Sequence, residues 1–111
     1  MSKWTLVLVG PLQGHKCSVR NVFGKGYVAW KRYVRLQADL ARVPQDLDPN
    51  GRYRVTTEIW WKGRARIDTE NVQKAAIDGL FKRDRRILEI RGYAYEVTGK
   101  EEASVTIEKL L

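Results

Sequence analysis

The sequence predicts a small single domain of the α/β (α+β) class, spanning residues 1–111, with the element order β-α-β-α-β-β. Stretches with the two-residue alternation of strands are interleaved with two segments that have the 3.6-residue periodicity of helices. The length is that of one domain. The 43% of hydrophobic residues, including 4 Trp and 5 Tyr, can build one core. We therefore expect a mixed sheet with two helices packed on it.

The first half of the chain predicts a strand, a basic loop and a helix. Residues 5–9 form a buried apolar strand that ends at Gly10-Pro11. Residues 10–26 then form a loop that contains glycines and cations. Residues 27–42 form the first helix, because apolar residues recur on one side of it at helical spacing. These residues are Trp30, Val34, Ala38 and Ala41.

The second half predicts a strand, a helix and two further strands. Residues 52–61 alternate, with Tyr53, Val55, Thr57, Ile59 and Trp61 on one face.

The second helix runs from about residue 69 to 82, after a short basic loop. Residues 87–97 form a strand whose apolar side changes near Gly92, where we expect a β-bulge. Residues 103–108 alternate again and should complete an antiparallel hairpin with that strand. The helices can leave one face of the sheet open, and exposed apolar sheet is a common dimer surface.

The charge balance favours a polyanionic partner. Lys and Arg number 21 against 13 Asp and Glu, a net charge of +8, which suits nucleic acid or an anionic membrane surface. No apolar run approaches the ~20 residues of a spanning helix, so we expect no membrane partner. A single cysteine, Cys17, excludes an internal disulfide framework and a cysteine-based zinc site. A reducing, cytoplasmic location fits this composition.

Acidic residues gather at the start of the second predicted helix, and helix physics alone can explain them. Asp68 is a good N-cap. Glu70 in the first turn suits the positive end of the helix dipole. Glu70 and Lys74 form an i,i+4 pair in the favourable order, and Asp78 extends the row. On this interpretation the cluster only stabilises the helix.

The same cluster can also be interpreted as a metal site. Carboxylates held close together repel each other, and a hard cation relieves that repulsion. Mg²⁺ prefers oxygen ligands and typically uses a few carboxylates and waters. Asp84 follows soon after the helix and could provide a third carboxylate. Acids clustered inside a basic chain suggest a divalent metal that works on a phosphate backbone.

The segment from Asp68 to Leu80 resembles one family closely. It has the spelling D-x-[DE]-N-x-x-K-x-x-x-D-[GA]-L, which is similar to that of the RusA-like Holliday junction resolvases. The resemblance implies that Asp68, Glu70 and Asp84 bind the metal, Mg²⁺ or Mn²⁺. It places the family's helix lysine on Lys74. Asn71 and Asp78 are then expected to orient the metal ligands without binding the metal themselves.

The resemblance also implies an activity and an assembly. The family hydrolyses DNA phosphodiesters in four-way junctions, as a homodimer with one active site per strand cut. This sequence departs from the pattern at two places. Glu70 stands where the family usually has Asp, and the connection from Leu80 to Asp84 is short. The third ligand therefore stays open, with Glu89 and Asp78 as the substitutes for Asp84.

Basic and aromatic residues complete the expectation of a DNA-binding surface. Cations that flank the acidic cluster can position a duplex through its phosphates without reading its sequence. Trp60 points to the polar face of its strand and could stack on a base, although a Trp is more often core or dimer interface. The expected phosphate contacts are Lys16, Arg20, Lys25, Lys62, Arg64 and Arg66.

Two other functions stay open at this point. The chain could be a non-catalytic nucleic-acid-binding module whose acids only cap and pair a helix. It could also be a nuclease of the same fold that acts on a different branched DNA.

Overall fold

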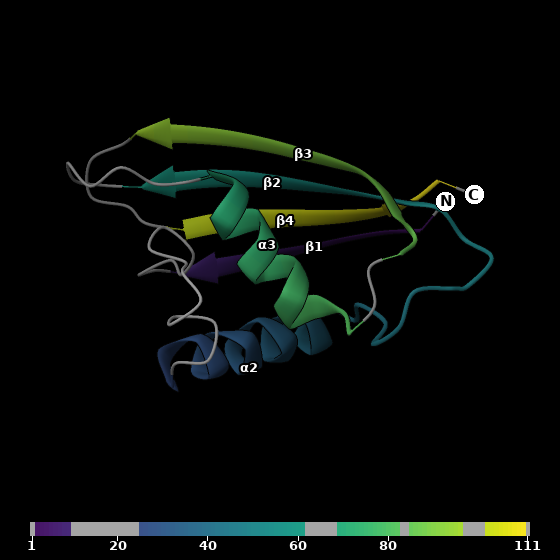
Figure 1. Cartoon of the computed structure of the whole chain (residues 1–111), viewed down its shortest axis with the longest axis horizontal. Coiled ribbons are helices and arrows are strands. Elements are labelled where there is room, and N and C mark those ends of the chain that lie inside the picture. The colour runs from purple at the N-terminus through teal and green to yellow at the C-terminus, as the bar shows by residue number, and fades with distance from the viewer. Residues whose placement is uncertain (1, 10–24, 62–68, 83–84, 97–101, 111) are drawn as a thin grey trace.

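The computed structural model describes residues 2–9, 25–61, 69–82, 85–96 and 102–110. Its elements follow the predicted order (Figure 1). They are β1 (Lys3–Val9), α2 (Lys25–Leu40), β2 (Tyr53–Trp61), α3 (Thr69–Leu80), β3 (Ile87–Glu96) and β4 (Glu102–Lys109). The predicted small domain with a mixed four-stranded sheet and two helices is thus confirmed. Neither described helix is long and apolar enough to cross a membrane.

The strand order in the sheet is β1-β4-β2-β3. β4 is antiparallel to both β1 and β2, while β2 and β3 are parallel. The predicted hairpin between the last two strands is therefore wrong, because β2 lies between them. β4 is a central strand, and its Ala103, Val105 and Ile107 are completely buried. A sequence alternates in the same way in a central and in an edge strand, so its pattern does not specify the neighbours.

The predicted bulge at Gly92 is also wrong in its position. Tyr53 pairs with Ile87 and Arg54 with Glu89, so the extra residue is Leu88. Gly92 pairs regularly with Thr57. Because glycine has no side chain, the side-chain amide of Gln73 from α3 fits against Gly92. A Cβ built on Gly92 would overlap the side chain of Gln73, which is buried.

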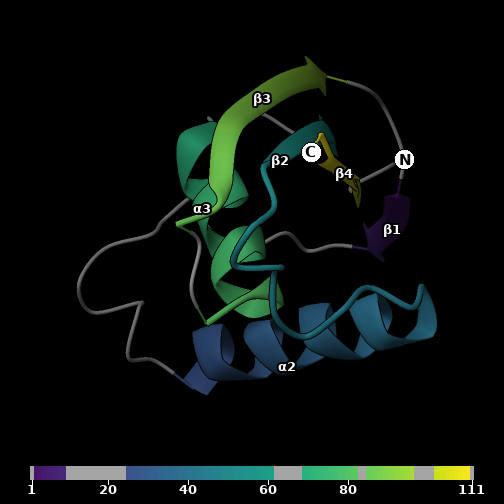
Figure 2. The same cartoon turned by 90° about the vertical axis from the view of Figure 1, so that its right-hand side faces the viewer.

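Both helices cover the same face of the sheet (Figures 1 and 2). The alternation predicted for residues 52–61 is confirmed, because Tyr53, Val55, Thr57 and Ile59 are buried. In α2 the predicted side is also buried at Trp30, Val34 and Ala38. Together with side chains of β1, β4 and α3 they form one core.

The two helices meet closely at Gly79. A Cβ built on Gly79 would lie 2.8 Å from the Cβ of Val34 and 3.3 Å from the backbone of Lys31. Arg35 ties the same region together, since its guanidinium donates to the carbonyl oxygens of Leu80 (2.7 Å) and Val43 (2.8 Å). The position of α3 on the sheet is therefore set by its contact with α2.

Candidate functional site

The acidic segment lies at the junction of β2 and α3. α3 begins at Thr69, one residue after Asp68. Glu70 and Asn71 therefore belong to its first turn. Their side chains, and the whole of Asp68 and Asp84, lie outside the described part of the structure. The sequence predicted this helix from about residue 69 to 82, so its start is confirmed, while α3 ends two residues earlier, at Leu80.

α3 presents one polar side to solvent. Lys74 and Asp78 are exposed on it, while Val72, Ala76 and Leu80 are buried against the rest of the domain. Because residues four apart lie one above the other on a helix, Glu70 belongs to the same row by its spacing. The row predicted from the sequence is thus solvent-accessible where the side chains are described.

The remaining expected ligand follows the other end of α3. Lys82 and Arg85, which flank Asp84 in the chain, come after the C-terminal end of the helix (Figure 1). A helix of 12 residues is about 18 Å long. The described residues next to Asp84 are therefore separated from the start of α3 by the length of that helix. No group of three His, Cys, Asp or Glu among the described residues could hold a metal ion.

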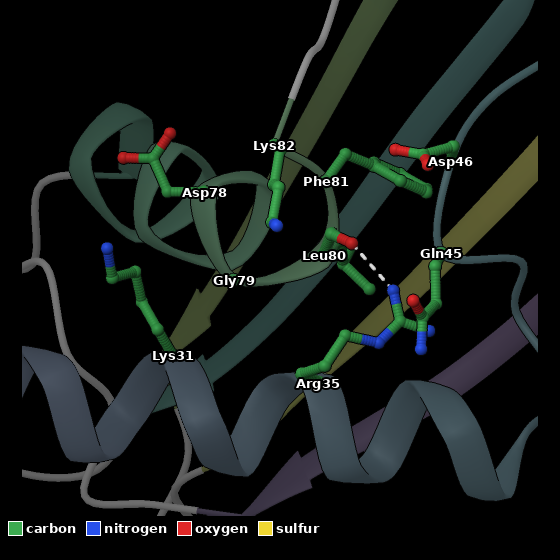
Figure 3. A pocket seen from close by; sticks show the side chains of 9 residues that line it. All are labelled: Lys31, Arg35, Gln45, Asp46, Asp78, Gly79, Leu80, Phe81 and Lys82. Atoms are coloured by element: carbon green, nitrogen blue, oxygen red, sulfur yellow. Dashed lines mark hydrogen bonds between the residues drawn. The ribbon is translucent and has the colours of Figure 1, made fainter.

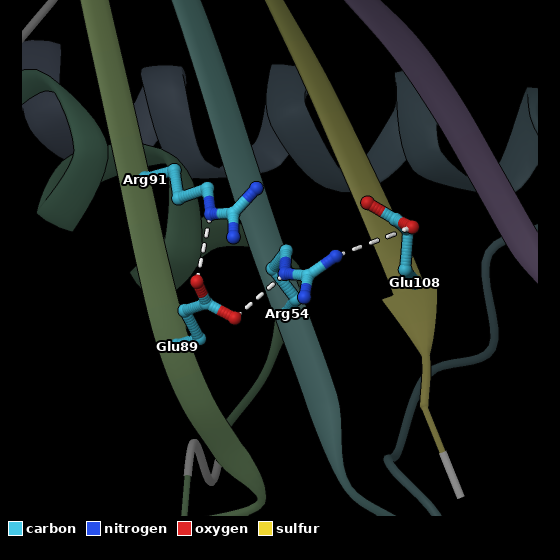
Figure 4. A network of polar contacts seen from close by, with 4 residues as sticks. All are labelled: Arg54, Glu89, Arg91 and Glu108. Atoms are coloured by element: carbon cyan, nitrogen blue, oxygen red, sulfur yellow. Dashed lines mark hydrogen bonds and ion pairs between the residues drawn. The ribbon is translucent and has the colours of Figure 1, made fainter.

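Glu89, the other candidate for third ligand, belongs to an ion network on the open face of the sheet (Figure 4). Its carboxylate accepts hydrogen bonds from Nε of Arg54 and from Nε of Arg91, each at 2.7 Å. These bonds, first that from Arg54, lower the pKa of Glu89. Arg54 also lies 3.8 Å from Glu108. Since α3 covers the opposite face, Glu89 is separated from the row of Lys74 and Asp78.

The open face is apolar at the end where β1, β2 and β3 finish. Trp60 and Tyr95 stack there, with ring centroids 5.7 Å apart and planes at 22°. Tyr93 is exposed on the same strand as Tyr95, while Val7 and Val9 are exposed on β1, where Glu102 and Ser104 of β4 lie between them and β2. The predicted orientation of Trp60 is confirmed. Tyr93 and Tyr95 were not predicted to lie on this face.

Two neighbouring hollows lie at the C-terminal end of α3. The first, about 330 Å³, opens between α2 and α3, with Lys31 and Arg35 on one wall and Asp78 and Lys82 on the other (Figure 3). The second, about 530 Å³, adjoins it through shared Asp46 and Lys82. Its other lining residues are Leu47, Pro49, Arg85 and Arg86.

The sequence analysis did not select these hollows. The cations around Asp84 stand together in the sequence as Lys82, Arg83, Arg85 and Arg86. That run of cations is the sequence signal for a basic surface at this place.

The cations that were selected lie largely outside the described residues. This applies to Lys16, Arg20, Lys62, Arg64 and Arg66. Lys25 is the first residue of α2, and its side chain is not described. In the chain, residues 62–68 connect the end of β2 to the start of α3.

Comparison with known proteins adds no assignment. The chain matches no protein-family model, and no curated protein is significantly similar to it.

Proposed function

We propose that this protein is a Mg²⁺-dependent endodeoxyribonuclease that resolves four-way DNA junctions by paired phosphodiester hydrolysis. The observation that carries the proposal is the start of α3. The helix begins directly after Asp68, and its solvent-exposed row contains Lys74 and Asp78 at the spacing of the resolvase-like motif. The excess of cations over acids, a net charge of +8, suits a DNA substrate.

The donor atoms of the proposed site fit the metal. Carboxylate oxygens are the hard ligands that Mg²⁺ prefers, and Mn²⁺ accepts the same donors. Asp68 and Glu70 are two residues apart in the chain at the start of α3, whereas the described residues next to Asp84 lie a helix length away, so Asp68 and Glu70 would be the metal ligands of one chain. A bound divalent cation would supply an activated water and neutralise charge on the phosphate. Lys74, an exposed cation on the same helix row, would stabilise the negative charge that develops on the phosphoryl oxygens. Asn71 and Asp78 would orient the ligands.

The proposal includes a homodimer, since one chain offers one acidic cluster and resolution needs two cuts. The open face of the sheet is the surface that suits a second copy. Its apolar end, formed by Val7, Val9, Trp60, Tyr93 and Tyr95, offers the aromatic anchors typical of interfaces.

The charge of the open face supports the same partner. Its described carboxylates are Glu58, Glu89, Glu102 and Glu108, and its described cations are Lys3, Arg54 and Arg91. The face is therefore nearly neutral in a chain of net charge +8. Two copies can approach through it without the repulsion that the rest of the surface would cause. A packing of this kind would leave the helix side available to DNA.

A cleavage assay with a divalent-metal titration tests the proposal. We expect a synthetic four-way junction to be cut at paired positions in Mg²⁺ and to stay intact in EDTA. Linear duplex and forked DNA of the same length serve as comparison substrates. Preferential cutting of the fork would assign a different branched DNA to the same nuclease. Junction binding without cleavage in Mg²⁺ or Mn²⁺ would instead show a non-catalytic binding module.

A further inference from the structure

We infer that the two hollows at the C-terminal end of α3 form a second DNA-contact surface, which binds the phosphate backbone through Lys82 and Arg85. This surface, called here the basic groove, consists of the residues that line both hollows. The inference rests on the DNA-binding part of the proposed function and not on its metal site.

Cations dominate the basic groove. Its ionisable lining comprises the cations Lys31, Arg35, Lys82, Arg85 and Arg86 and the carboxylates Asp46 and Asp78. Lys82, Arg85 and Arg86 are all exposed. The ion pairs found among the described residues involve neither Lys82 nor Arg85. These two side chains are therefore available for an external anion.

Two carboxylates outside the groove are paired with cations within the domain. Asp48 accepts a hydrogen bond from the Lys109 ammonium at 2.8 Å and another from the backbone N–H of Asn50 at 2.9 Å. The Lys109 bond is the main reason that the pKa of Asp48 is lowered. On α2, Asp39 pairs with Arg35 at 2.9 Å. The carboxylates that line the groove itself, Asp46 and Asp78, are outnumbered by its five cations.

The partial negative charge at the C-terminal end of α3 is also partly compensated. A helix C-terminus carries partial negative charge on its unsatisfied carbonyl groups, which would repel a phosphate. Here Arg35 donates to the Leu80 carbonyl oxygen at 2.7 Å (Figure 3). This bond satisfies one of those groups and also fixes the wall between the two helices. The groove is thus preformed on one side by a hydrogen-bonded arginine.

The position of the groove complements the acidic segment. The groove lies at one end of α3 and Glu70 at the other, about 18 Å apart for 12 residues. That spacing exceeds the ~12 Å width of the major groove of DNA. When a duplex arm of the junction is held at the acidic segment, the phosphate that contacts the basic groove would therefore come from the other side of a DNA groove or from a neighbouring arm. Such a contact positions the substrate and carries no sequence information.

Salt-dependent binding of a fluorescent four-way junction in EDTA tests the inference without any cleavage. Each phosphate contact contributes a slope of roughly −0.9 to the dependence of log affinity on log salt. The double variant Lys82→Ala/Arg85→Ala should lose about 1.8 of that slope. Between 50 and 200 mM salt, the wild type should then lose about 12-fold more affinity than the variant.

Two further variants control for charge and folding. Arg32→Ala/Arg42→Ala removes two exposed cations that do not line the groove, and it should keep the wild-type slope. Lys82→Arg/Arg85→Lys keeps both charges and should also keep the slope. Circular dichroism should show that all variants are folded. Equal slopes for Lys82→Ala/Arg85→Ala and the wild type would overturn the inference and leave the proposed nuclease standing. No junction binding by the wild type would overturn both.

Discussion

The contact between α2 and α3 gives a prediction in which two effects of known size oppose each other. Replacing Gly79 by Ala adds a methyl group where the nearest atom, Cβ of Val34, would be 2.8 Å away. Overpacking of this kind typically costs about 1–3 kcal/mol. The same substitution stabilises the helix by about 1 kcal/mol, because Gly is a poor helix former. Gly79→Ala should therefore destabilise the protein by about 0–2 kcal/mol.

The cost should fall when Val34 is shortened. Val34→Ala removes Cγ1, which would lie 3.0 Å from the new Cβ, and keeps the Val34 Cβ at 2.8 Å. Because Val34 is completely buried, the loss of its methyl groups also leaves space into which the helices can adjust. Gly79→Ala should therefore cost less in that background, with a coupling free energy of about 1 kcal/mol.

Urea unfolding of the wild type, both single variants and the double variant measures this coupling. Circular dichroism and tryptophan fluorescence should give the same transition, as for a two-state domain. If Gly79→Ala changes the free energy of unfolding equally in both backgrounds, the close approach of the helices is wrong. The described positions of the basic groove and of the exposed row with Lys74 and Asp78 would then also be in question, because both depend on how α3 packs against α2.

Three other variants test separate parts of the structure. Thr57 is fully buried, and its hydroxyl has no hydrogen-bond partner among the described residues, so Thr57→Val should stabilise by about 1–3 kcal/mol; an unchanged or lower Tm would contradict this. The lowered pKa of Glu89 means that its carboxylate stabilises the fold above its usual value of 4.5 and stops doing so as the pH falls through the lowered value. Unfolding of Glu89→Gln should therefore approach that of the wild type as the pH falls from about 7 to about 3, and a constant difference would refute the ion network. Tyr93→Ala/Tyr95→Ala should shift the sedimentation coefficient from dimer to monomer.

The dimer test has a matched control on the helix layer. Leu36 and Leu40 of α2 are exposed apolar residues, 57% and 72% accessible, away from the open face. Leu36→Ala/Leu40→Ala should leave the sedimentation of the wild type unchanged. A wild-type chain that is monomeric at working concentrations, yet fully active on junctions, would remove the dimer from the proposal.

The sequence predicted local structure well because periodicity reports which side of an element is buried. The alternation of β2 identified its buried face, and the spacing of Trp30, Val34 and Ala38 identified the core side of α2. The helix predicted from about residue 69 begins at Thr69 in the structure. Each of these inferences depends only on neighbours in the chain.

The pairing of strands that are distant in the chain could not be predicted from periodicity. The insertion of β4 between β1 and β2 depends on partners more than forty residues away, which no local pattern records. The change of apolar side in β3 was visible, but its cause was misjudged. The extra residue of β3 is Leu88, near the start of the strand, while Gly92 pairs regularly and accommodates Gln73.

The candidate site was predicted in part. Lys74 and Asp78 share an exposed helix row as expected, because i,i+4 spacing fixes their relation. The expected third carboxylate was placed by resemblance alone, and Glu89 turned out to belong to the ion pairs of the open sheet face. The basic groove joins α2, the 44–50 connection and the end of α3, a juxtaposition that only the folded chain creates.

Substitution of Asp68 is the measurement that tests the central claim most directly. Asp68→Asn removes one proposed ligand charge and leaves the cations of the chain unchanged. In Mg²⁺ it should abolish cleavage of a four-way junction while junction affinity in EDTA stays at the wild-type value. Asp39→Asn, which removes an exposed carboxylate of α2 that pairs with Arg35, should cleave at the wild-type rate. Cleavage by Asp68→Asn at the wild-type rate would contradict the proposed metal site.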